Sequence, residues 1–472
     1  MNVPLTSIVF VFFFMPASIL LYRLVPVKYR NVLLLILSVL FIAWGSPADI
    51  ILIALSTAFN YFTALELERL RGNGRKIAKK LVLASGIAAN AALLIFYKYS
   101  IFLMNNIGAI TGMSFRFTVP QAPIGISFFT FSAISCLCDV ARGVEDTLHN
   151  PVDFALYISF FGKITSGPIV RFSEMARQIR QRGLTADSME SGLRLFITGL
   201  AKKTVIAGCL ASFFNAVKAG QSDSMSALTA WLGALFYSLM LYYDFSGYSD
   251  MAIGLGRLFG FSFSKNFDHP YASSGMTDFW RRWHISLGTW FRDYVYIPLG
   301  GSRVSKARNI FNLSVVWMLT GLWHGANWTF VVWGLYHLTL LLLEKFVLKS
   351  ILSKIPAAVK MIGTFLLAVI GWTIFFSDNI SYCAAYLLRM IGIGGSGLAD
   401  RQGLYYLCGG GILLAAAIFG STPIPAAVGN RIAKRGGTFV QVISTVFFAL
   451  LLLGSTAFMI SDSVSSFLYA QF

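Results

Sequence analysis

Two histidines stand in apolar stretches of this chain and are the side chains best suited to chemistry. His284 lies in the stretch 279–287, FWRRWHISL, and His324 lies in the stretch 321–327, GLWHGAN. An imidazole is expensive to bury among apolar side chains, and its charge changes near neutral pH. We therefore weigh a functional role for each histidine against the alternative of a buried, hydrogen-bonded structural residue.

His324 is the stronger candidate for a general base. Thr320 lies one helical turn before it, Asn327 one turn after it, and Gly321 and Gly325 flank it. Small residues beside a polar side chain let another backbone or a ligand approach closely. A buried imidazole that a substrate can reach can accept a proton from a hydroxyl. The alternative is a histidine satisfied by its neighbours in the core.

The sequence around His284 predicts one helix over 278–296, with Thr277 as its N-cap. Because an α-helix has about 3.6 residues per turn, Trp280, Trp283 and His284 would share one face. The two indoles would exclude water from the imidazole, which lowers its pKa and keeps it neutral and able to accept a proton. The alternative is a core histidine bonded to a backbone carbonyl.

The other three histidines are weaker candidates for chemistry. If the helix that carries His324 continued, His337 would lie about 220° around it, so the two are not expected to share a site. His149 falls in a predicted loop, and His269 precedes a proline. We interpret both of these as structural or solvated residues.

Four carboxylates lie near the two candidate histidines in the sequence. They should be paired, because an unpaired charge in an apolar chain is costly. We expect an ion-pair network or, alternatively, carboxylates that orient an imidazole or a polar substrate. The acids are Asp244, Asp250, Asp278 and Asp293, and the available partners are Arg257, Arg281, Arg282 and Arg292.

Other reactive constellations are missing from the sequence. It contains no Gly-x-Ser-x-Gly elbow, no Walker loop and no His-Glu-x-x-His helix, and the histidines lack cysteine or carboxylate neighbours at zinc-site spacing. The five cysteines lie in apolar stretches and are interpreted as packing residues. We therefore expect no metal site and a histidine that acts as base toward a substrate hydroxyl, without a protein nucleophile.

The elements that position these residues belong to a membrane protein. Of the 472 residues, 56% are hydrophobic and 12% are charged, whereas a soluble globular protein carries about 25% charged residues. Unbroken apolar runs such as Leu81–Met104 predict spanning helices rather than the alternating strands of a barrel. The expected fold class is an all-α polytopic membrane protein in the lipid bilayer.

The formal net charge is +18. In a soluble protein this excess would suggest nucleic acid as a partner. In a membrane protein, lysine and arginine gather in cytoplasmic loops and face anionic lipid, so we expect no nucleic-acid partner. The same charge could attract an anionic substrate.

Apolar runs of spanning length alternate with basic and uncharged loops. Because positive loops stay in the cytoplasm, the basic loop at 67–80 is predicted to be cytoplasmic and the N-terminus extracytoplasmic. The first run, Ile8–Leu24, lacks the features of a cleaved signal and is interpreted as a retained helix. The predicted spans are 6–24, 32–45, 49–66, 81–104, 123–140, 225–243, 329–348, 356–376, 403–420 and 438–460, and a further helix is expected at 309–325.

The central part of the chain predicts something other than a plain helix bundle. Residues 141–220 mix bases with short apolar pieces, and Val152–Ile164 is short enough for a re-entrant or interfacial helix. The polar stretch Asp244–Asp250 suggests non-helical backbone at membrane depth. One domain over 1–472 accounts for the chain, with N-terminal spans at 1–140, a core bearing the motifs at 141–345 and C-terminal spans at 346–472.

Five stretches resemble the membrane-bound O-acyltransferases, in the bacterial branch that O-acetylates alginate and D-alanylates teichoic acid. Within that branch, the length and the residues of three of these motifs, Tyr243–Gly256, Asp278–Leu287 and Gly321–Asn327, are closer to the polysaccharide O-acetylating side. The resemblance covers most of the chain as far as about residue 345. The stretches are Tyr243–Gly256, Asp278–Leu287, Gly321–Asn327, Pro123–Phe128 and Ser166–Arg171.

This resemblance implies an activity and a site. His324 matches the family's essential histidine, and His284 matches its second position, which holds asparagine or histidine. The fold would be a ring of transmembrane helices around a thin core of re-entrant and interfacial helices, forming a funnel. We expect residues of the same motifs to bind substrate or support the site, namely Trp280, Arg281, Arg282, Trp283, Trp323, Asn327, Asp244, Ser246 and Asp250.

The resemblance also implies substrates, partners and location. The donor would be acetyl-CoA or another acyl thioester that enters from the cytoplasm, with no bound cofactor. The acceptor would be an extracytoplasmic polysaccharide hydroxyl, reached with an extracytoplasmic SGNH-type acetyltransferase partner. The protein would lie in the bacterial inner membrane, in cell-envelope or exopolysaccharide biosynthesis such as that of alginate.

Three alternative functions stay open at this point. One is a D-alanyl transferase that uses a carrier-protein thioester for teichoic acid. Another is a polyol or glycan transporter in which the histidines relay protons, which the lack of an internal repeat disfavours. The third is a non-catalytic scaffold of a secretion complex, in which both histidines could be replaced without loss.

Overall fold

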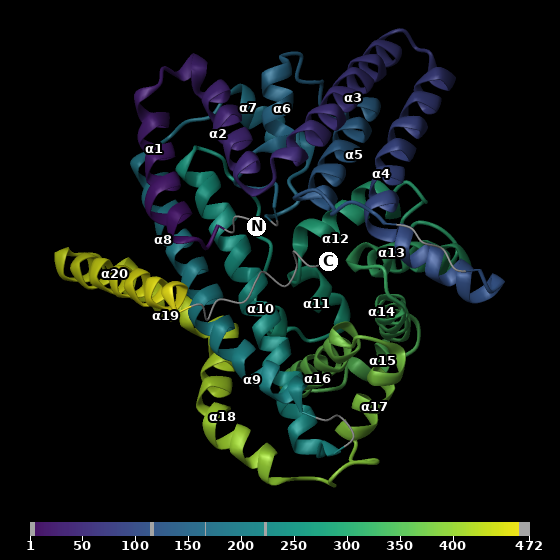
Figure 1. The fold of residues 1–472 in the computed structure, drawn as a ribbon, viewed down its shortest axis with the longest axis vertical. Helices are drawn as coiled ribbons and strands as arrows, with labels where there is room; N and C mark the ends of the chain where they lie inside the picture. Colours follow the sequence, from purple (N-terminus) through teal and green to yellow (C-terminus); the bar gives the residue numbers. More distant parts are fainter. Residues whose placement is uncertain (1–4, 114–117, 166, 221–223, 462–472) are drawn as a thin grey trace. The chain divides into compact units, whose positions relative to one another are not determined.

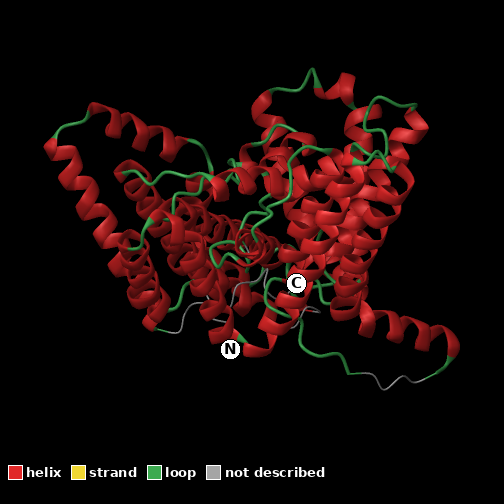
Figure 2. Ribbon diagram, turned by 90° about the horizontal axis from the view of Figure 1, so that it is seen from above, coloured by secondary structure: helices red, strands yellow, loops and turns green. Residues whose placement is uncertain are grey.

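A computed structural model describes residues 5–113, 118–165, 167–220 and 224–461, and these residues form helices and loops without strands (Figure 2). The chain forms two compact units. The first unit comprises 1–196 and 249–264, and the second comprises 197–248 and 265–472. The expected all-α class is confirmed. The single-domain boundaries and the ring-shaped arrangement stay predictions.

The first unit is built around α5 (Ile126–Arg142), whose residues from Ile126 to Ala141 are all buried. Helices α3, α4, α6 and α7 pack against it (Figure 1). The other elements of this unit are η1 (Phe10–Phe14), α1 (Met15–Leu24), η2 (Val27–Tyr29), α2 (Arg30–Gly45), α3 (Pro47–Gly72), α4 (Lys76–Thr111), α6 (Pro151–Ser159) and α7 (Phe172–Arg180).

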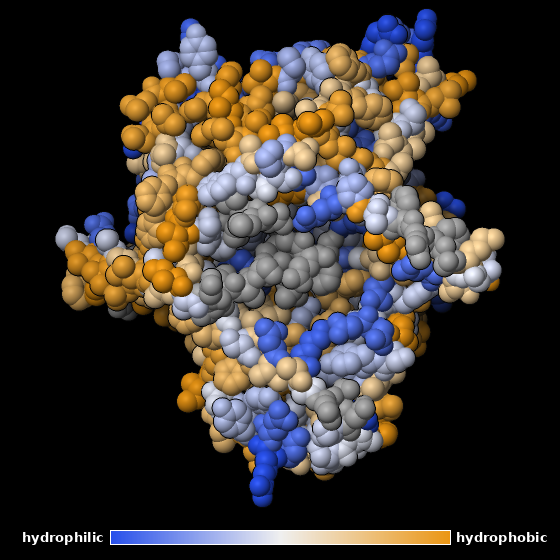
Figure 3. Space-filling model, in the orientation of Figure 1, coloured by the Kyte–Doolittle hydropathy of each residue, from blue (hydrophilic) through white to orange (hydrophobic). Residues whose placement is uncertain are grey.

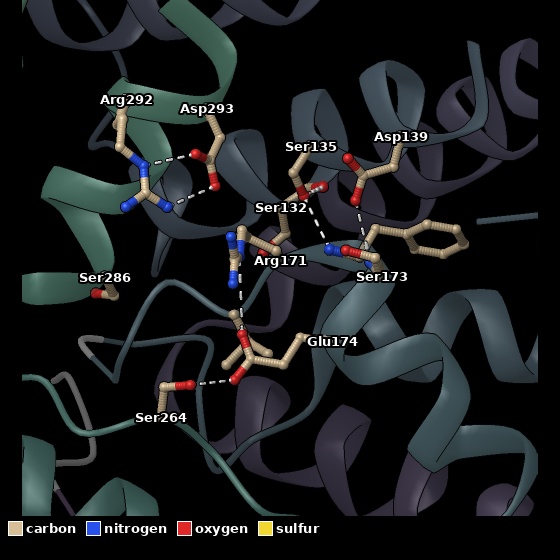
Figure 4. Close-up of polar contacts among 12 residues, drawn as sticks. Ser132, Ser135, Asp139, Arg171, Ser173, Glu174, Ser264, Ser286, Arg292 and Asp293 are labelled. Carbon is tan, nitrogen blue, oxygen red and sulfur yellow. Dashed lines mark hydrogen bonds and ion pairs between the residues drawn. The ribbon is translucent and has the colours of Figure 1, made fainter. Parts of the chain in front are cut away.

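Two of the motif stretches lie in this unit, at the beginnings of α5 and α7. Gly125 has a left-handed backbone, and a Cβ there would lie 1.9 Å from the carbonyl oxygen of Ile164, so only glycine fits. Beyond the second stretch, Glu174 accepts a hydrogen bond of 2.6 Å from Ser264 and lies 3.9 Å from Arg171 (Figure 4). Ser166, the first residue of that stretch, lies outside the described residues. These motifs therefore join loops to helix starts.

The second unit contains both candidate histidines. Helix α8 (Ala186–Ala201) leads into it from the first unit, and α10 (Ala227–Leu258) returns to the first unit. The other elements are η3 (Lys202–Ala207), α9 (Gly208–Ala219), η5 (Pro270–Ala272), α11 (Met276–Arg282), α12 (Ile285–Phe291), η6 (Arg292–Tyr296), α13 (Lys306–His324), α14 (Trp328–Phe346), α15 (Lys349–Leu352), α16 (Ala357–Phe376), α17 (Ile380–Met390), α18 (Arg401–Ser421), α19 (Ile424–Arg435) and α20 (Thr438–Ile460).

Eight helices of the described chain are long and apolar enough to cross a membrane, which makes this a multi-pass membrane protein. Apolar side chains cover α1 and α2 and line α20 (Figure 3). Ala186–Ala219 is one of the eight, although the sequence there suggested only short pieces. The predicted spans 123–140 and 225–243 are helical but are not among the eight.

The expected helix break at Asp244–Asp250 is wrong, because α10 is continuous through this stretch. The carboxylate of Asp244 forms a buried ion pair with Lys203 of η3. A Cβ on Gly247 would lie 2.6 Å from the carbonyl oxygen of Gly199. The polar and small residues thus let a neighbouring backbone approach, and the helix keeps its own hydrogen bonds.

Candidate active site

His284 lies at a break between two short helices. Helix α11 ends at Arg282, His284 has a left-handed backbone with φ 46°, and α12 begins at Ile285. The predicted continuous helix over 278–296 is therefore wrong. The expectation that Trp280, Trp283 and His284 share one face of that helix is wrong for the same reason. The sequence has neither glycine nor proline at the break to signal it.

Asn266 holds this break in place. Its carbonyl oxygen accepts a hydrogen bond of 2.9 Å from the backbone N–H of Ile285, and its side-chain oxygen accepts bonds of 3.1 Å and 2.9 Å from the N–H and hydroxyl of Ser286. These bonds satisfy donors that the first turn of a helix leaves without partners. Asn266 is a site residue that the sequence reasoning missed, since it lies in a loop 18 residues away.

Glu344 of α14 organises the start of α11 in a similar way. Its carboxylate accepts hydrogen bonds from the backbone N–H groups of Met276, at 2.6 Å, and of Thr277, at 3.2 Å. A carboxylate at a helix N-terminus also interacts favourably with the helix dipole. Thr277 is thus inside the helix, and the expectation that it forms the N-cap is wrong.

The imidazole of His284 is buried and neutral. Its ring packs edge-to-face against Phe245 at 4.7 Å, and desolvation lowers its pKa from 6.5 to about 3. Nδ1 lies 3.3 Å from Asn266 Oδ1, which is an acceptor, so Nδ1 carries the proton and Nε2 has a lone pair. The neutral form stabilises the fold above pH 6.5, and this contribution is lost as the pH falls toward 3.

The left-handed backbone predicts which residues can replace His284. Among non-glycine residues asparagine tolerates this conformation best, whereas a β-branched side chain is strained in it. We expect His284→Asn to keep the unfolding free energy close to that of the native protein and His284→Val to lower it by about 1–2 kcal/mol or more. Denaturant unfolding in detergent measures both, with Ile285→Val as the matched control in α12. Equal stability of the two His284 variants would contradict this reading.

His324 is the last residue of α13 and is also buried. Its ring packs edge-to-face against Trp323 and Trp333, both at 4.9 Å, and against Phe375 at 5.2 Å. The flanking glycines do permit a close approach, as predicted, but the approaching group is protein. A Cβ on Gly321 would lie 2.5 Å from the carbonyl oxygen of Phe330 in α14.

The chain reverses direction directly after His324, so Asn327 does not lie one helical turn beyond it as expected. Asn327 is the N-cap of α14, where its side-chain oxygen accepts a hydrogen bond of 3.1 Å from the N–H of Thr329. Its amide donates a bond of 2.8 Å to the carbonyl oxygen of Asp378. Asn327 therefore shapes the turn that ends the His324 helix.

The two candidate histidines both lie close to one indole. The ring of Trp323 is 4.9 Å from that of His324 and 5.9 Å from that of His284. The break between α11 and α12 and the end of α13 thus bring together two residues that are 40 positions apart. The sequence predicted both histidines and Trp323 as site residues, and their proximity supports that grouping.

His337 shares the surroundings of His324, contrary to expectation. Because α14 runs back along α13, Trp333 lies 4.9 Å from His324 and 4.8 Å from His337. We call these surroundings the aromatic cluster, which consists of Trp280, Trp317, Trp333, His337, Trp372 and Phe375. The prediction assumed an uninterrupted helix, which the turn at 325–327 rules out.

The remaining two histidines have structural contacts, in agreement with their interpretation. His149 Nε2 lies 3.5 Å from a carboxylate oxygen of Glu68, and His269 Nδ1 lies 3.2 Å from the carbonyl oxygen of Ser421. Groups of three or more histidine, cysteine or carboxylate side chains that could hold a metal are not found among the described residues.

The four carboxylates have different partners from one another. Asp278 pairs with Arg282 at 2.9 Å, and Asp293 pairs with Arg292 at 2.8 Å (Figure 4), as predicted. Asp244 pairs with Lys203 instead of an arginine. Three expected site residues lie on α10: Asp244 and Ser246, both buried, belong to the second unit, and Asp250, half-buried, belongs to the first unit.

A cleft of about 1170 Å³ opens beside His284 within the second unit. Its volume matches or exceeds that of sites for drug-sized ligands, which hold about 300–1,000 Å³. Four of the expected site residues line it, and the others do not. The lining ones are Trp280, Arg281, Trp283 and His284, and the others in this unit are Arg282, Trp323, His324, Asn327, Asp244 and Ser246.

The cleft has an excess of basic side chains, among them Lys345 of α14, Lys349 of α15 and Lys360 of α16. Arg281 of α11 also lines it. Lys345 donates a hydrogen bond of 2.6 Å to Asn309. Arg281, Lys349 and Lys360 make no ion pair with the described residues. Such a group of cations favours a ligand that carries several negative charges.

Comparison with known proteins gives consistent matches. The family model described as "MBOAT, membrane-bound O-acyltransferase family" matches residues 95–388. A Pseudomonas aeruginosa protein named "probable alginate O-acetylase AlgI" is 42% identical over 379 residues, 79% of this chain and 72% of the relative. Its Pseudomonas putida namesake is 37% identical over 486 residues, 99% of each chain. A Helicobacter pylori "peptidoglycan O-acetyltransferase" is 35% identical over 432 residues, 84% of this chain and 80% of the relative.

Proposed function

Because the chain belongs to the membrane-bound O-acyltransferase family, we propose that it moves an acetyl group from a cytoplasmic thioester to an extracytoplasmic polysaccharide hydroxyl. The family assignment makes it a multi-pass membrane enzyme of O-acyl transfer. One observation carries the proposal: His284 lines a basic cleft, and the ring of Trp323 lies 5.9 Å from that of His284 and 4.9 Å from that of His324. The names of the relatives, an alginate O-acetylase and a peptidoglycan O-acetyltransferase, support a polysaccharide acceptor.

His324 acts as the general base in the proposed reaction. Its imidazole accepts the proton of the acceptor hydroxyl while the hydroxyl oxygen attacks the thioester carbonyl. The tetrahedral intermediate then collapses, the carbon–sulfur bond breaks, and the thiolate leaves with the proton that His324 had accepted. A positioned base contributes about 10² to 10⁴ to such a rate. No covalent acyl-protein intermediate is required.

His284 positions a substrate in this scheme and does not polarise the carbonyl. Its only imidazole proton is on Nδ1, which faces Asn266, so Nε2 can act as an acceptor and not as a donor. Its low pKa, about 3, keeps it from becoming a cation near neutral pH. An imidazole in that state can accept a hydrogen bond from a hydroxyl or an amide N–H of a substrate.

Acetyl-CoA is the donor that the basic cleft suits best. Arg281, Lys349 and Lys360 offer charges for phosphate groups, and His284 lines the same cleft. Lysine and arginine mark the cytoplasmic side of membrane proteins, which supports entry of the donor from the cytoplasm. By the same rule we propose that the N-terminus lies outside. The bacterial inner membrane is the location that the family resemblance implies, and we propose it here.

Charge reversal in the cleft is expected to weaken donor binding selectively. We predict that Lys349→Glu and Lys360→Glu each raise KM for acetyl-CoA on the order of 10-fold with kcat nearly unchanged, because each replaces a phosphate attraction by a repulsion. Acetyl-pantetheine, which lacks the nucleotide phosphates, should show no such increase. Lys354→Glu, an exposed lysine outside the cleft, is the matched control. Equal increases for both donors would contradict a phosphate site.

An extracytoplasmic SGNH-type acetyltransferase is the proposed partner that completes transfer to the glycan. The test uses the purified full chain in proteoliposomes with labelled acetyl-CoA outside and alginate or peptidoglycan fragments inside, with and without that partner. The proposal requires label in O-acetyl esters of the glycan. Transfer only from a D-alanyl carrier protein would favour the teichoic acid reaction, and glycan uptake without acylation would favour a transporter. Either of these results would overturn acetyl transfer.

A further inference from the structure

Trp280 lies between the cleft and the residues that surround His324. It lines the cleft, and its ring is 4.9 Å from His337 and 5.5 Å from Trp333 in the aromatic cluster. Trp333 in turn is 4.9 Å from His324. Neither Trp333 nor His324 lines the cleft. One line of ring contacts therefore runs from the cleft through Trp280 and Trp333 to the candidate base.

One hydrogen bond fixes the orientation of Trp280. Its indole N–H donates to Nδ1 of His337 at 3.3 Å, across 57 positions of the chain. In the neutral imidazole the proton of His337 must then be on Nε2. This bond is the only polar contact of the Trp280 indole among the described residues. Losing it would free the indole to rotate about its side-chain torsions.

His337 is itself immobilised. It is 1% exposed and packs edge-to-face against Trp333 at 4.8 Å and Tyr336 at 5.0 Å. On the other side is Gly371 of α16, where a Cβ would lie 2.8 Å from Nε2 of His337. A glycine is needed there because any side chain would displace the imidazole. The buried side chain of His337 thus serves to hold Trp280 in one orientation.

We propose that Trp280 is a gate between the donor cleft and His324, and that His337 is the positioning residue that holds the gate closed. This inference rests on the proposed acyl transfer. Opening of the indole would break its contact with Trp333 and let the thioester pass beside Trp333 to His324, and closure would exclude water. When water enters, its oxygen attacks the thioester carbonyl, the carbon–sulfur bond breaks, and acetic acid and a free thiol are formed without an acceptor. The gate therefore couples thiol release to ester formation.

The gate has a readout that does not depend on acyl transfer. Diethyl pyrocarbonate modifies neutral imidazoles that it can reach, and peptide mass spectrometry reports the rate at His324. Trp280→Phe removes the indole N–H, and His337→Leu removes its acceptor. We expect each to raise the rate at His324 by about 2- to 10-fold, the range that one net hydrogen bond represents. Because both act on one bond, the double variant should be no faster than either single one.

Two further arms complete the test. His337→Gln restores an acceptor and should return the rate toward the native value, and Trp328→Phe, at an exposed tryptophan outside the cleft, is the matched control. Acceptor-independent thiol release from acetyl-CoA should rise in the same variants as the modification rate. Unchanged modification, or additive effects in the double variant, would overturn the gate. If the native protein shows this gating but transfers no label to glycan, the gate would be kept and only the proposed function would be rejected.

Discussion

Replacing His324 with glutamine is expected to lower kcat for acetyl transfer by about 10² to 10⁴-fold. Glutamine keeps a polar side chain of similar volume between Trp323 and Trp333, so packing around the end of α13 should persist. It cannot accept a proton near neutral pH, so the acceptor hydroxyl would have to attack without a base. Steady-state transfer of labelled acetyl groups measures the loss.

Binding of the donor provides the control for that variant. KM for acetyl-CoA should stay within a few-fold, because His324 does not line the cleft that we propose for the donor. The thermal unfolding temperature in detergent should also stay near that of the native protein. A His324→Gln variant with native kcat would remove His324 from the role of base.

Replacing Asp244 alone with leucine is expected to lower the free energy of unfolding by about 3–5 kcal/mol. The side chain of Lys203 is 1% exposed, and that of its partner Asp244 is 4% exposed. Loss of the carboxylate would leave a buried ammonium group without its counter-charge. Denaturant unfolding in detergent measures the change, and protein that remains folded should keep its KM for acetyl-CoA.

The paired replacement separates charge from packing. Asp244→Leu with Lys203→Met removes both charges at similar volume and should recover most of the lost stability, since a well-packed apolar pair can replace a buried ion pair. Full stability of the single Asp244→Leu variant would show that the ion pair has no structural role. A selective rise in KM would return Asp244 to the substrate-supporting role that the sequence suggested.

The parts of the site that the sequence predicted are those encoded locally. His284 and His324 stood out because ionisable residues in apolar stretches are costly without a use, and Trp323 followed from the family resemblance. All three stay predictions as site residues. Composition and run length sufficed for the helical membrane class. The close approach of protein at Gly321 also followed from residue size alone.

The parts that the sequence missed depend on contacts between distant segments. Asn266, Glu344 and Lys203 each satisfy a backbone or a charge on another helix, and local periodicity carries no signal for such partners. The break at His284 has no glycine or proline to announce it. The misplacement of His337 had one cause, the assumption that a helix continued through the turn after His324.

One single-turnover measurement tests the central claim most directly. Native protein and its proposed SGNH-type partner are mixed with labelled acetyl-CoA and an acceptor glycan. The reaction is quenched over time, and the label is counted in free thioester, in glycan ester and on each protein. The account predicts that each thiol released is matched by one ester on the glycan, that no label stays on the protein, and that His324→Gln blocks the step. Label held covalently by the protein, or an undiminished rate in His324→Gln, would contradict direct transfer with His324 as base.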